Sequence, residues 1–573
     1  MNKHGSLTLT KTLFMAKVKE KIMKKIILML AISIIIVSQL FAIRTPAVIK
    51  TLSAHNDVNI LNKYDIDIDN VTSTEITVYV DDNELAELLA MGFDIYRIPY
   101  RAKEYADSLW QATKDSDNPM DDYHNYDELT AFLQNIESQY PDICKLITVG
   151  QSVQGRELWF MKISDNVDIE EDEPEFKYIA NMHGDEPVGR ELLIYLITLI
   201  TDNYGIDPRF TKMVDSLELW IMPSMNPDGF EMHTRYNANG VDLNRNFPDP
   251  ITNPVNTPAG REPETQAIMY YAFGHSSVLS ANFHTGALVV NYPYDCMYQL
   301  TPDNDLFIDI SLAYSIHNGP MYYGSFPQGI TNGAQWYIIH GGMQDWNYYW
   351  MGDNEVTVEQ CNDKWPSASW LPGLWDDNRE SMLSYIETIY RGIRGIVTDT
   401  QGIPLDATIV VDGIDHEVYT DPDVGDYHRM LLPGTYSITV SAEGYVPQSI
   451  NNIVVVDSQA TRVDVQLVSG SSVDIHNNKV GSIPVLEQNY PNPFNPITNI
   501  RYYLPKKAKV EIGIYNILGQ KINTLVDCIM ESGYHNVIWT GKDENNNDVS
   551  SGIYLYKINT DNFTETKRMV LIK

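Results

Sequence analysis

The stretch KYIANMHGDE, residues 177–186, decides the fold that the sequence predicts. Residues 177–181 form a short, mainly apolar run that is typical of a buried strand, and this run ends just before His183. Apolar residues then recur from Leu192 to Leu199 at the spacing of one helix face. A strand that passes through a polar loop into a helix is a building unit of α/β domains, where active residues lie at the ends of strands.

The same pattern recurs on both sides of this stretch. Residues 126–140 predict an amphipathic helix, and residues 217–222 predict a second strand. Residues 278–283 predict a third strand, which ends at His284. This alternation favours an α/β domain over residues 119–392 with a mixed, mostly parallel central sheet.

His183, Glu186 and His284 are candidate ligands of one metal ion. A histidine and a carboxylate three residues apart at a loop can both reach one cation. The pair alone is a weak signal, because a chain with 13 histidines and many glutamates is expected to contain such a pair by chance. His284, at the end of another predicted strand, strengthens it. Two histidines and one glutamate leave a fourth position open for water, as in a catalytic zinc site.

Two longer stretches between these residues are specific enough to indicate a family. They are MNPDGF, residues 225–230, and RYNANGVDLNRNFPD, residues 235–249. With them the chain resembles the zinc metallocarboxypeptidase family, in the branch that includes carboxypeptidases N, E and D, over roughly residues 119–468. The resemblance implies one Zn²⁺ ion per catalytic domain, held by the residues that match the family's ligands, namely His183, Glu186 and His284.

The resemblance also implies how a peptide is bound. The residues matching Asn244 and Arg245 bind the terminal carboxylate of the substrate, and the residue matching Arg235 polarises the scissile carbonyl. Elementary chemistry agrees, because a guanidinium and an amide suit a carboxylate and a second arginine can stabilise an oxyanion. The alternative for the two arginines is a role in surface ion pairs.

Two further site residues follow from the resemblance. Tyr337, after the stretch GITNGAQW, matches a mobile tyrosine that closes over the substrate. Glu359 matches the general base that takes a proton from zinc-activated water. Glu355 competes for this role, because both glutamates would point to the same face of a strand and alternation alone cannot exclude it. A surface carboxylate on this strand is the other alternative for Glu359.

A preference for Lys or Arg as the last residue is predicted from Asp295 and Gln344, which match polar residues of the family's specificity pocket. A buried carboxylate left unpaired is costly, so it favours a cationic side chain. The alternative for Asp295 is a turn residue after Pro293. The chain departs from the branch at Thr285, where glycine is usual, which puts fine specificity in doubt.

The first 42 residues predict a signal peptide. Lys24 and Lys25 precede the apolar run 26–37, and small or polar residues follow up to Ala42. This run is shorter than the ~20 residues of a spanning helix, so we expect no transmembrane span in the mature chain. Met23 is an alternative start, with the residues before it upstream of the protein.

Residues 43–115 precede the catalytic domain and show a strand at 75–80, a helix at 83–91 and a second strand at 94–98. A pro-segment and an N-terminal packing module both agree with this small strand–helix–strand unit. The sequence does not choose between them.

The C-terminal third predicts two small all-β sandwich domains. Residues 393–468 resemble the transthyretin-like domain that follows the catalytic domain in this branch, and residues 469–484 form a polar linker. Residues 485–573 resemble the sorting domains of type IX secretion cargo, which implies that secretion machinery as a partner. A plain adhesive β-sandwich is the alternative. We therefore expect a protein released from the cell or attached to its surface.

The amino-acid composition limits which functions and partners the protein can have. The formal charge of −35 excludes nucleic acid as a partner, because a phosphate backbone would meet a repelling field. Four cysteines do not make a disulfide scaffold, although a bond between Cys296 and Cys361 is conceivable. We predict an exported zinc carboxypeptidase that acts on peptide and protein C-termini. The alternatives are an amidase acting on cell-wall or modified peptides and a non-catalytic peptide-binding or adhesion protein.

Overall fold

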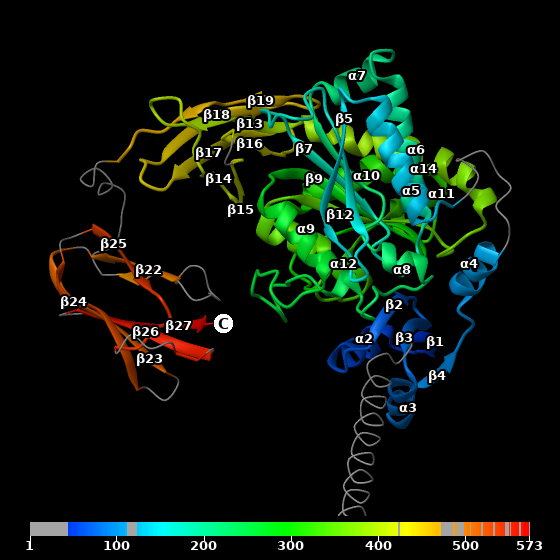
Figure 1. Ribbon diagram of the computed structural model, residues 1–573, viewed down its shortest axis with the longest axis horizontal. Helices are drawn as coiled ribbons and strands as arrows, with labels where there is room; N and C mark the ends of the chain where they lie inside the picture. The colour runs from blue at the N-terminus through cyan, green and yellow to red at the C-terminus, as the bar shows by residue number, and fades with distance from the viewer. Residues whose placement is uncertain are drawn as a thin grey trace, which may run out of the picture.

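The strand predicted at residues 177–181 is β7 (Glu175–Ala180), which is buried along its whole length in the computed structural model (Figure 1). The structure describes residues 44–111, 123–421, 424–470, 485–486, 489, 498–504, 506–516, 520–530, 533–544, 549–550, 552–560 and 563–571. The predicted signal peptide and most of the predicted linker lie outside these residues.

β7 belongs to an eight-stranded sheet in the order β11-β10-β12-β9-β7-β8-β6-β5. The pairs β7–β8, β7–β9, β9–β12 and β10–β11 are parallel, and the other three are antiparallel. The predicted α/β domain with a mixed, mostly parallel sheet is thereby confirmed. The other strands are β5 (Cys144–Gln151), β6 (Glu157–Ile163), β8 (Glu218–Met222), β9 (Ser277–His284), β10 (Ala287–Tyr292), β11 (Ile330–Asn332) and β12 (Asn354–Cys361).

Helices pack on both faces of this sheet, because neighbouring side chains of each strand point in opposite directions. Phe176 and Tyr178 of β7 join one hydrophobic core with α5, α6, α10 and α14, whereas Ile179 joins a second core with α9 and α13. The helices are α5 (Tyr126–Gln139), α6 (Val188–Asn203), α7 (Pro208–Val214), α8 (Pro227–Glu231), α9 (Pro263–Phe273), α10 (Asn304–Ser315), α11 (Gly319–Tyr322), α12 (Gly333–Trp336), α13 (Met343–Trp346) and α14 (Leu371–Glu387).

Residues 44–111, which we call the N-terminal module, form an antiparallel sheet in the order β2-β3-β1-β4 with α2 and α3 packed on it. The predicted strands at 75–80 and 94–98 and the helix between them are present as β3 (Glu75–Val80), β4 (Asp94–Arg97) and α3 (Asp82–Ala90). The expectation of a unit with only these three elements was wrong. It lacked β1 (Thr45–Lys50), α2 (Ala54–Lys63), β2 (Asp67–Val71) and the following α4 (Arg101–Gln111).

Residues 392–468 form two sheets around a core of their own, with the orders β16-β13-β19 and β15-β14-β17-β18. The last part of this domain divides between two short strands, β19 and β20, that both pair with β13. The strands are β13 (Gly392–Thr398), β14 (Ala407–Val411), β15 (Ile414–Tyr419), β16 (Asp426–Arg429), β17 (Gly434–Ala442), β18 (Gln448–Val455), β19 (Ala460–Arg462) and β20 (Val465–Gln466).

The C-terminal domain consists of two sheets as well, in the orders β21-β22-β25 and β24-β23-β26-β27. Figure 1 shows it in orange and red, apart from the N-terminal module in blue. Within the described parts of the chain, no helix is long and apolar enough to cross a membrane. The strands are β21 (Val485–Leu486), β22 (Thr498–Leu504), β23 (Ala508–Asn516), β24 (Lys521–Met530), β25 (Gly533–Trp539), β26 (Gly552–Thr560) and β27 (Phe563–Leu571).

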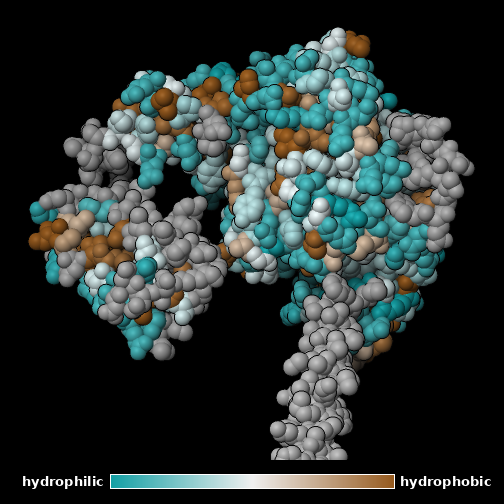
Figure 2. Space-filling model, viewed as in Figure 1, coloured by the Kyte–Doolittle hydropathy of each residue, from teal (hydrophilic) through white to brown (hydrophobic). Residues whose placement is uncertain are grey.

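The visible surface of the catalytic domain and the N-terminal module is mainly hydrophilic, with hydrophobic residues in several separate patches (Figure 2). This surface agrees with the formal charge of −35.

Candidate metal centre and active site

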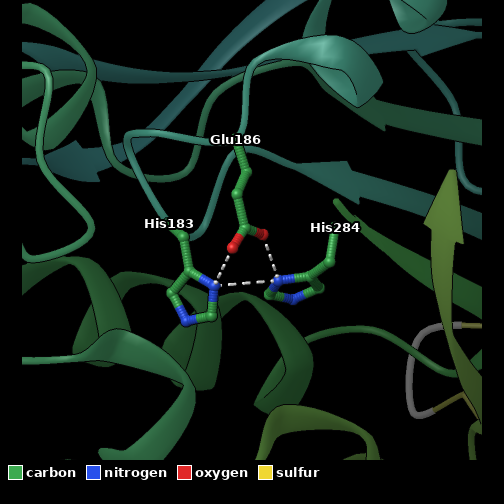
Figure 3. A group of neighbouring side chains, drawn as sticks. All are labelled: His183, Glu186 and His284. Atoms are coloured by element: carbon green, nitrogen blue, oxygen red, sulfur yellow. Dashed lines mark hydrogen bonds and ion pairs between the residues drawn. The ribbon is translucent and has the colours of Figure 1, made fainter. Parts of the chain in front are cut away.

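His183, Glu186 and His284 converge on one point, although a hundred residues separate the two histidines in the chain (Figure 3). The Nδ1 atoms of His183 and His284 lie 3.0 Å apart. One carboxylate oxygen of Glu186 lies 3.1 Å from Nδ1 of His183, and the other lies 2.9 Å from Nδ1 of His284. All three side chains are buried.

This geometry suits a zinc ion. Nitrogen and oxygen ligands at 2.0–2.1 Å from a tetrahedral zinc lie about 3.3 Å from one another, which is close to the separations here. Three lone pairs that point at one buried spot repel each other unless a cation lies among them. Although burial opposes ionisation, the charge of Lys364 holds the pKa of Glu186 well below its ordinary value, so the carboxylate is available as a ligand.

The loop after β7 places His183 and Glu186. Asn181 adopts a left-handed conformation with φ 56°, and its side-chain amide donates to the main-chain oxygen of His183 at 2.9 Å. A Cβ atom on Gly184 would overlap the backbone of Gly229, so only glycine fits there. On the far side of the ring, Nε2 of His183 lies 3.0 Å from a carboxylate oxygen of Asp242, which fixes the ring orientation.

Arg235 lies beside the three candidate ligands. Its Nη1 atom is 3.1 Å from Nδ1 of His183, and its Nε atom donates to Asp242 at 2.9 Å. Only 2% of Arg235 is exposed, so it is not a surface ion-pair residue. A buried guanidinium at this place can stabilise negative charge that develops on a carbonyl oxygen.

Asn244 and Arg245 follow in the short helical turn Leu243–Arg245. Their side chains line the same cavity as the candidate ligands. The Oδ1 atom of Asn244 accepts a hydrogen bond from the main-chain nitrogen of Met343 at 3.0 Å, which fixes the amide orientation. The amide and the guanidinium are therefore placed as a pair of donors for a carboxylate.

Glu359 and Tyr337 line the same cavity. Burial, followed by the neighbouring charge of Glu186, raises the pKa of Glu359 to about 8. Its Oε2 atom has no hydrogen-bond partner among the residues that the structure describes. A carboxylate in this state can accept a proton near neutral pH.

Glu355 has different surroundings, although it lies on the same strand. Its carboxylate accepts hydrogen bonds from Ser280 at 2.9 Å, from Asn282 at 2.8 Å and from Asn347 at 2.6 Å. The amine of Lys177 lies 3.9 Å away. Glu355 is thus part of a buried polar network and does not line the cavity, which favours Glu359 as the base.

The two predicted specificity residues lie near each other, but Gln344 does not line the cavity. Asp295 lines it, is 3% exposed and accepts a hydrogen bond from Asn291 at 3.0 Å. Burial, and then the carboxylate of Asp345, raise the pKa of Asp295 well above its ordinary value, and nearby Gln344 acts in the opposite direction. A Cβ atom on Gly333 would overlap Asp295, so a glycine keeps the space beside Asp295 open.

The structure therefore brings nine of the ten residues that the sequence predicted to one cavity, whereas the tenth, Gln344, is buried near Asp295 and does not line it. Three more that the prediction omitted also belong here. Asp242 holds both His183 and Arg235, Lys364 reaches Glu186 at 2.6 Å, and Asp69 comes from the N-terminal module. Asp242 lies inside the quoted stretch 235–249 and could have been suspected, but no sequence pattern marks Lys364 or Asp69. The conceivable disulfide is absent, because Cys296 and Cys361 are both free and buried.

Family comparisons agree with the order of the domains. Residues 129–381 match the zinc carboxypeptidase family, and residues 392–468 match the carboxypeptidase regulatory-like domain. Residues 488–573 match the secretion system C-terminal sorting domain.

Related proteins match a large part of the chain. The chain is 44% identical to carboxypeptidase D of Homo sapiens over 391 residues, covering 63% of this chain and 28% of that protein. It is 39% identical to the carboxypeptidase N catalytic chain of Mus musculus over 398 residues, covering 61% of this chain and 87% of that protein. The chain spans only 26–31% of the length of the carboxypeptidase D relatives.

Solved structures share the fold. The structure superposes on carboxypeptidase A from Helicoverpa armigera with a TM-score of 0.51 and 18% identity, covering 60% of this chain and 96% of that chain.

Proposed function

Because the chain belongs to the zinc carboxypeptidase family, we propose that it hydrolyses the C-terminal residue of peptides and proteins, with Lys or Arg preferred. The convergence of His183, Glu186 and His284 beside Arg235 and Glu359 carries this proposal. A metal site flanked by a cation and a free carboxylate has the groups that amide hydrolysis needs.

We propose the following roles for the side chains. Zinc, when bound by His183, Glu186 and His284, supplies a Lewis acid. Oε2 of Glu359 accepts a proton from the attacking water and passes it to the nitrogen of the leaving residue. Arg235 stabilises the charge that forms on the carbonyl oxygen as water attacks the carbonyl carbon, before the C–N bond breaks.

Selection of a free C-terminus rests on Asn244 and Arg245. An amide and a guanidinium side by side bind the two oxygens of a carboxylate, but an internal peptide bond offers them no charge. This supports exopeptidase rather than endopeptidase activity.

The preference for a basic last residue rests on Asp295. A cationic side chain that reaches Asp295 would pair with this carboxylate and remove the cost of burying its charge. A neutral side chain leaves that cost in place.

Export is also part of the proposal. The sorting-domain match supports transport by the type IX machinery to the cell surface or beyond, where protein and peptide C-termini are the available substrates.

The test compares a peptide ending in Lys with its amidated form before and after removal of metal. We expect the free acid alone to lose one residue, chelation to abolish this, and added zinc to restore it. Release of ammonia from the amidated peptide would instead favour an amidase. No turnover with zinc bound would favour a binding protein.

A further inference from the structure

Two strands of the central sheet begin beside a second group of potential metal ligands. Glu175 is the first residue of β7 and Glu218 the first of β8, and the two are partners in the parallel register of these strands. His275 lies just beyond α9, and its Nδ1 atom is 3.0 Å from a carboxylate oxygen of Glu175. Ligand atoms of Glu170, Glu175 and His275 all lie within 4.8 Å of one another. We call these three residues and Glu218 the strand-start cluster.

The strand-start cluster lies at the opposite end of the sheet from the active site. β7 runs from Glu175 toward His183, and β9 runs from Ser277 to His284. At about 3.3 Å per residue, the length of β9 separates the two places by about 20 Å. The cluster is therefore distinct from the proposed catalytic metal centre.

The cluster has more carboxylates than its neighbouring lysine can balance. The buried amine of Lys162 lies 2.7 Å from Oε2 of Glu218 and 3.8 Å from a carboxylate oxygen of Glu170. Like charges at partner positions of two strands repel each other. Burial, and then the charges of Glu175 and Glu218, raise the pKa of Glu170 to about 8. Three carboxylates against one lysine leave two negative charges, which one divalent cation would balance.

Glu218 independently indicates a bound cation. Its side chain is fully buried, and Oε1 has no hydrogen-bond partner within the described parts of the chain. A buried carboxylate oxygen is normally satisfied by a donor, by water or by an ion. Since Glu218 and Glu175 are register partners, their side chains leave the sheet on the same face. The free oxygen of Glu218 is therefore on the side where Glu175 meets His275.

Aromatic packing holds the ring of His275 at the cluster. The ring stacks on Tyr271 with centroids 4.2 Å apart, and it meets the edge of Trp220 at 4.7 Å. Both aromatic residues are buried. A ligand whose orientation is already fixed loses little conformational entropy when it binds a metal ion. His275 also lines a groove of about 980 Å³, through which an ion can enter.

A neighbouring group of the same residue types has its charge already balanced. Asp172, Asp426 and His428 also bring ligand atoms within 4.8 Å of one another. Arg462 and Arg394, however, lie 2.5 Å and 3.4 Å from the carboxylate of Asp172. Two guanidinium groups at this distance repel a metal ion. This second group is therefore a set of ion pairs between two domains.

We propose that the strand-start cluster binds a second zinc ion, with His275, Glu175 and Glu170 as ligands and Glu218 beside them. An imidazole among carboxylates favours zinc over calcium or magnesium, which prefer oxygen ligands alone. The ion joins the loop before β7 to the strand ends and to the end of α9. Its role is structural, and it does not depend on the proposed carboxypeptidase function.

The first experiment counts the zinc bound to the full chain, by elemental analysis after equilibration with zinc and removal of the free ion. We expect about two equivalents in the unaltered chain and about one in Glu170→Gln and His275→Phe. The phenylalanine keeps the ring stacked on Tyr271 but offers no nitrogen to a metal. Glu171→Gln removes the next carboxylate of the same loop, which accepts from Asn166, and is the matched control that should keep both ions.

The second experiment measures affinity and stability. In competition with a chelator, Glu170→Gln and His275→Phe should hold the second zinc at least about 100-fold more weakly than the unaltered chain. His284→Ala should lose the other zinc and keep this one. Adding zinc to the metal-free protein should raise the midpoint of thermal unfolding more in His284→Ala than in the double variant with His275→Phe.

Each outcome decides for or against the second site. One zinc in the unaltered chain, or two in both site variants, would overturn it. Equal losses in Glu170→Gln and Glu171→Gln would also overturn it, because the acidic loop would then bind zinc only adventitiously. Hydrolysis of a peptide ending in Lys is a separate readout, which His275→Phe should leave unchanged. A chain that binds two zinc ions and cleaves no peptide would refute the proposed function and leave this site standing.

Discussion

Glu359 of β12 lies directly opposite His284 of β9 in the register of two parallel strands. The proposed base is therefore placed beside a proposed metal ligand by backbone hydrogen bonds in the middle of a sheet, and not by a loop. Such a scaffold holds the two groups at a constant separation, as proton transfer to and from a reacting water requires.

Replacing Glu359 by Gln should therefore affect catalysis and little else. The amide keeps the volume but cannot take up a proton, so we expect kcat to fall by about 10²–10⁴-fold. Bound zinc, measured by elemental analysis, should stay at the level of the parent. Retention of full activity by this variant would show that another group is the base.

Glu355→Gln is the matched change on the same strand, and we expect the opposite result. The change leaves Lys177 and Asp353 with an altered charge balance and disturbs three hydrogen bonds in a buried network. Loss of a partner in such a network lowers the free energy of unfolding by about 3–5 kcal/mol. Thermal unfolding should reveal this loss, whereas kcat at a temperature where the variant is folded should change little.

His284→Ala should weaken metal binding. Removal of one of three protein ligands is expected to lower zinc affinity by at least about 100-fold. This is more than the loss of a group that only hydrogen-bonds to a ligand. Competition with a chelator measures the affinity. His317→Ala, at an exposed histidine, is the control and should leave it unchanged.

Asp295→Ala should change which peptides are cleaved. Without the carboxylate, the ratio of kcat/KM for a C-terminal Lys against a C-terminal Leu is expected to fall by about 10²-fold or more, mainly through slower cleavage of the Lys peptide. Gly333→Ala, which crowds the same carboxylate, should lower activity on both. An unchanged ratio in Asp295→Ala would place the specificity pocket elsewhere.

The contact between the catalytic and regulatory-like domains should depend on pH through Asp426. Burial, and then the charges of Asp172 and Asp421, raise the pKa of Asp426 from 3.8 to about 8. The folded protein thus keeps a proton that the unfolded chain has already lost. Its contribution to stability is complete below about pH 4 and disappears as the pH rises through about 8.

Asp426→Asn should remove that dependence. The fall in unfolding free energy between pH 5 and 8.5, measured with denaturant, is expected to be smaller in the variant by on the order of 1–3 kcal/mol. If the unfolding free energies of parent and variant fall by the same amount between pH 5 and 8.5, Asp426 is ionised in the folded protein.

Much of the catalytic domain could be predicted from the sequence because its elements carry regular patterns. The spacing of apolar residues in 126–140 predicts a helix, and the capping residues Asn125 and Glu128 mark where it begins. The metal ligands could be predicted because each lies at or just beyond the end of a buried strand. The choice between Glu355 and Glu359 could not be made from strand alternation, which assigns both to one face, and rested on the family resemblance.

The contacts between the N-terminal module and the active site could not be predicted in the same way. β2, with the sequence DIDNV, has too few apolar residues to be recognised as a strand, and its contact partners are more than 160 residues away. Polar contacts between residues far apart in the chain produce no periodic pattern in a single sequence. Lys364 was overlooked for the same reason, because its partners Glu186 and Asp69 come from two other parts of the chain.

The most direct test of the central claim is a mass spectrum of the products from a peptide ending in Lys, incubated with the zinc-loaded chain. The account predicts that the peptide loses one lysine residue and stays intact when its terminus is amidated or zinc is removed. Cleavage at an internal bond, or hydrolysis that continues without zinc, would contradict it.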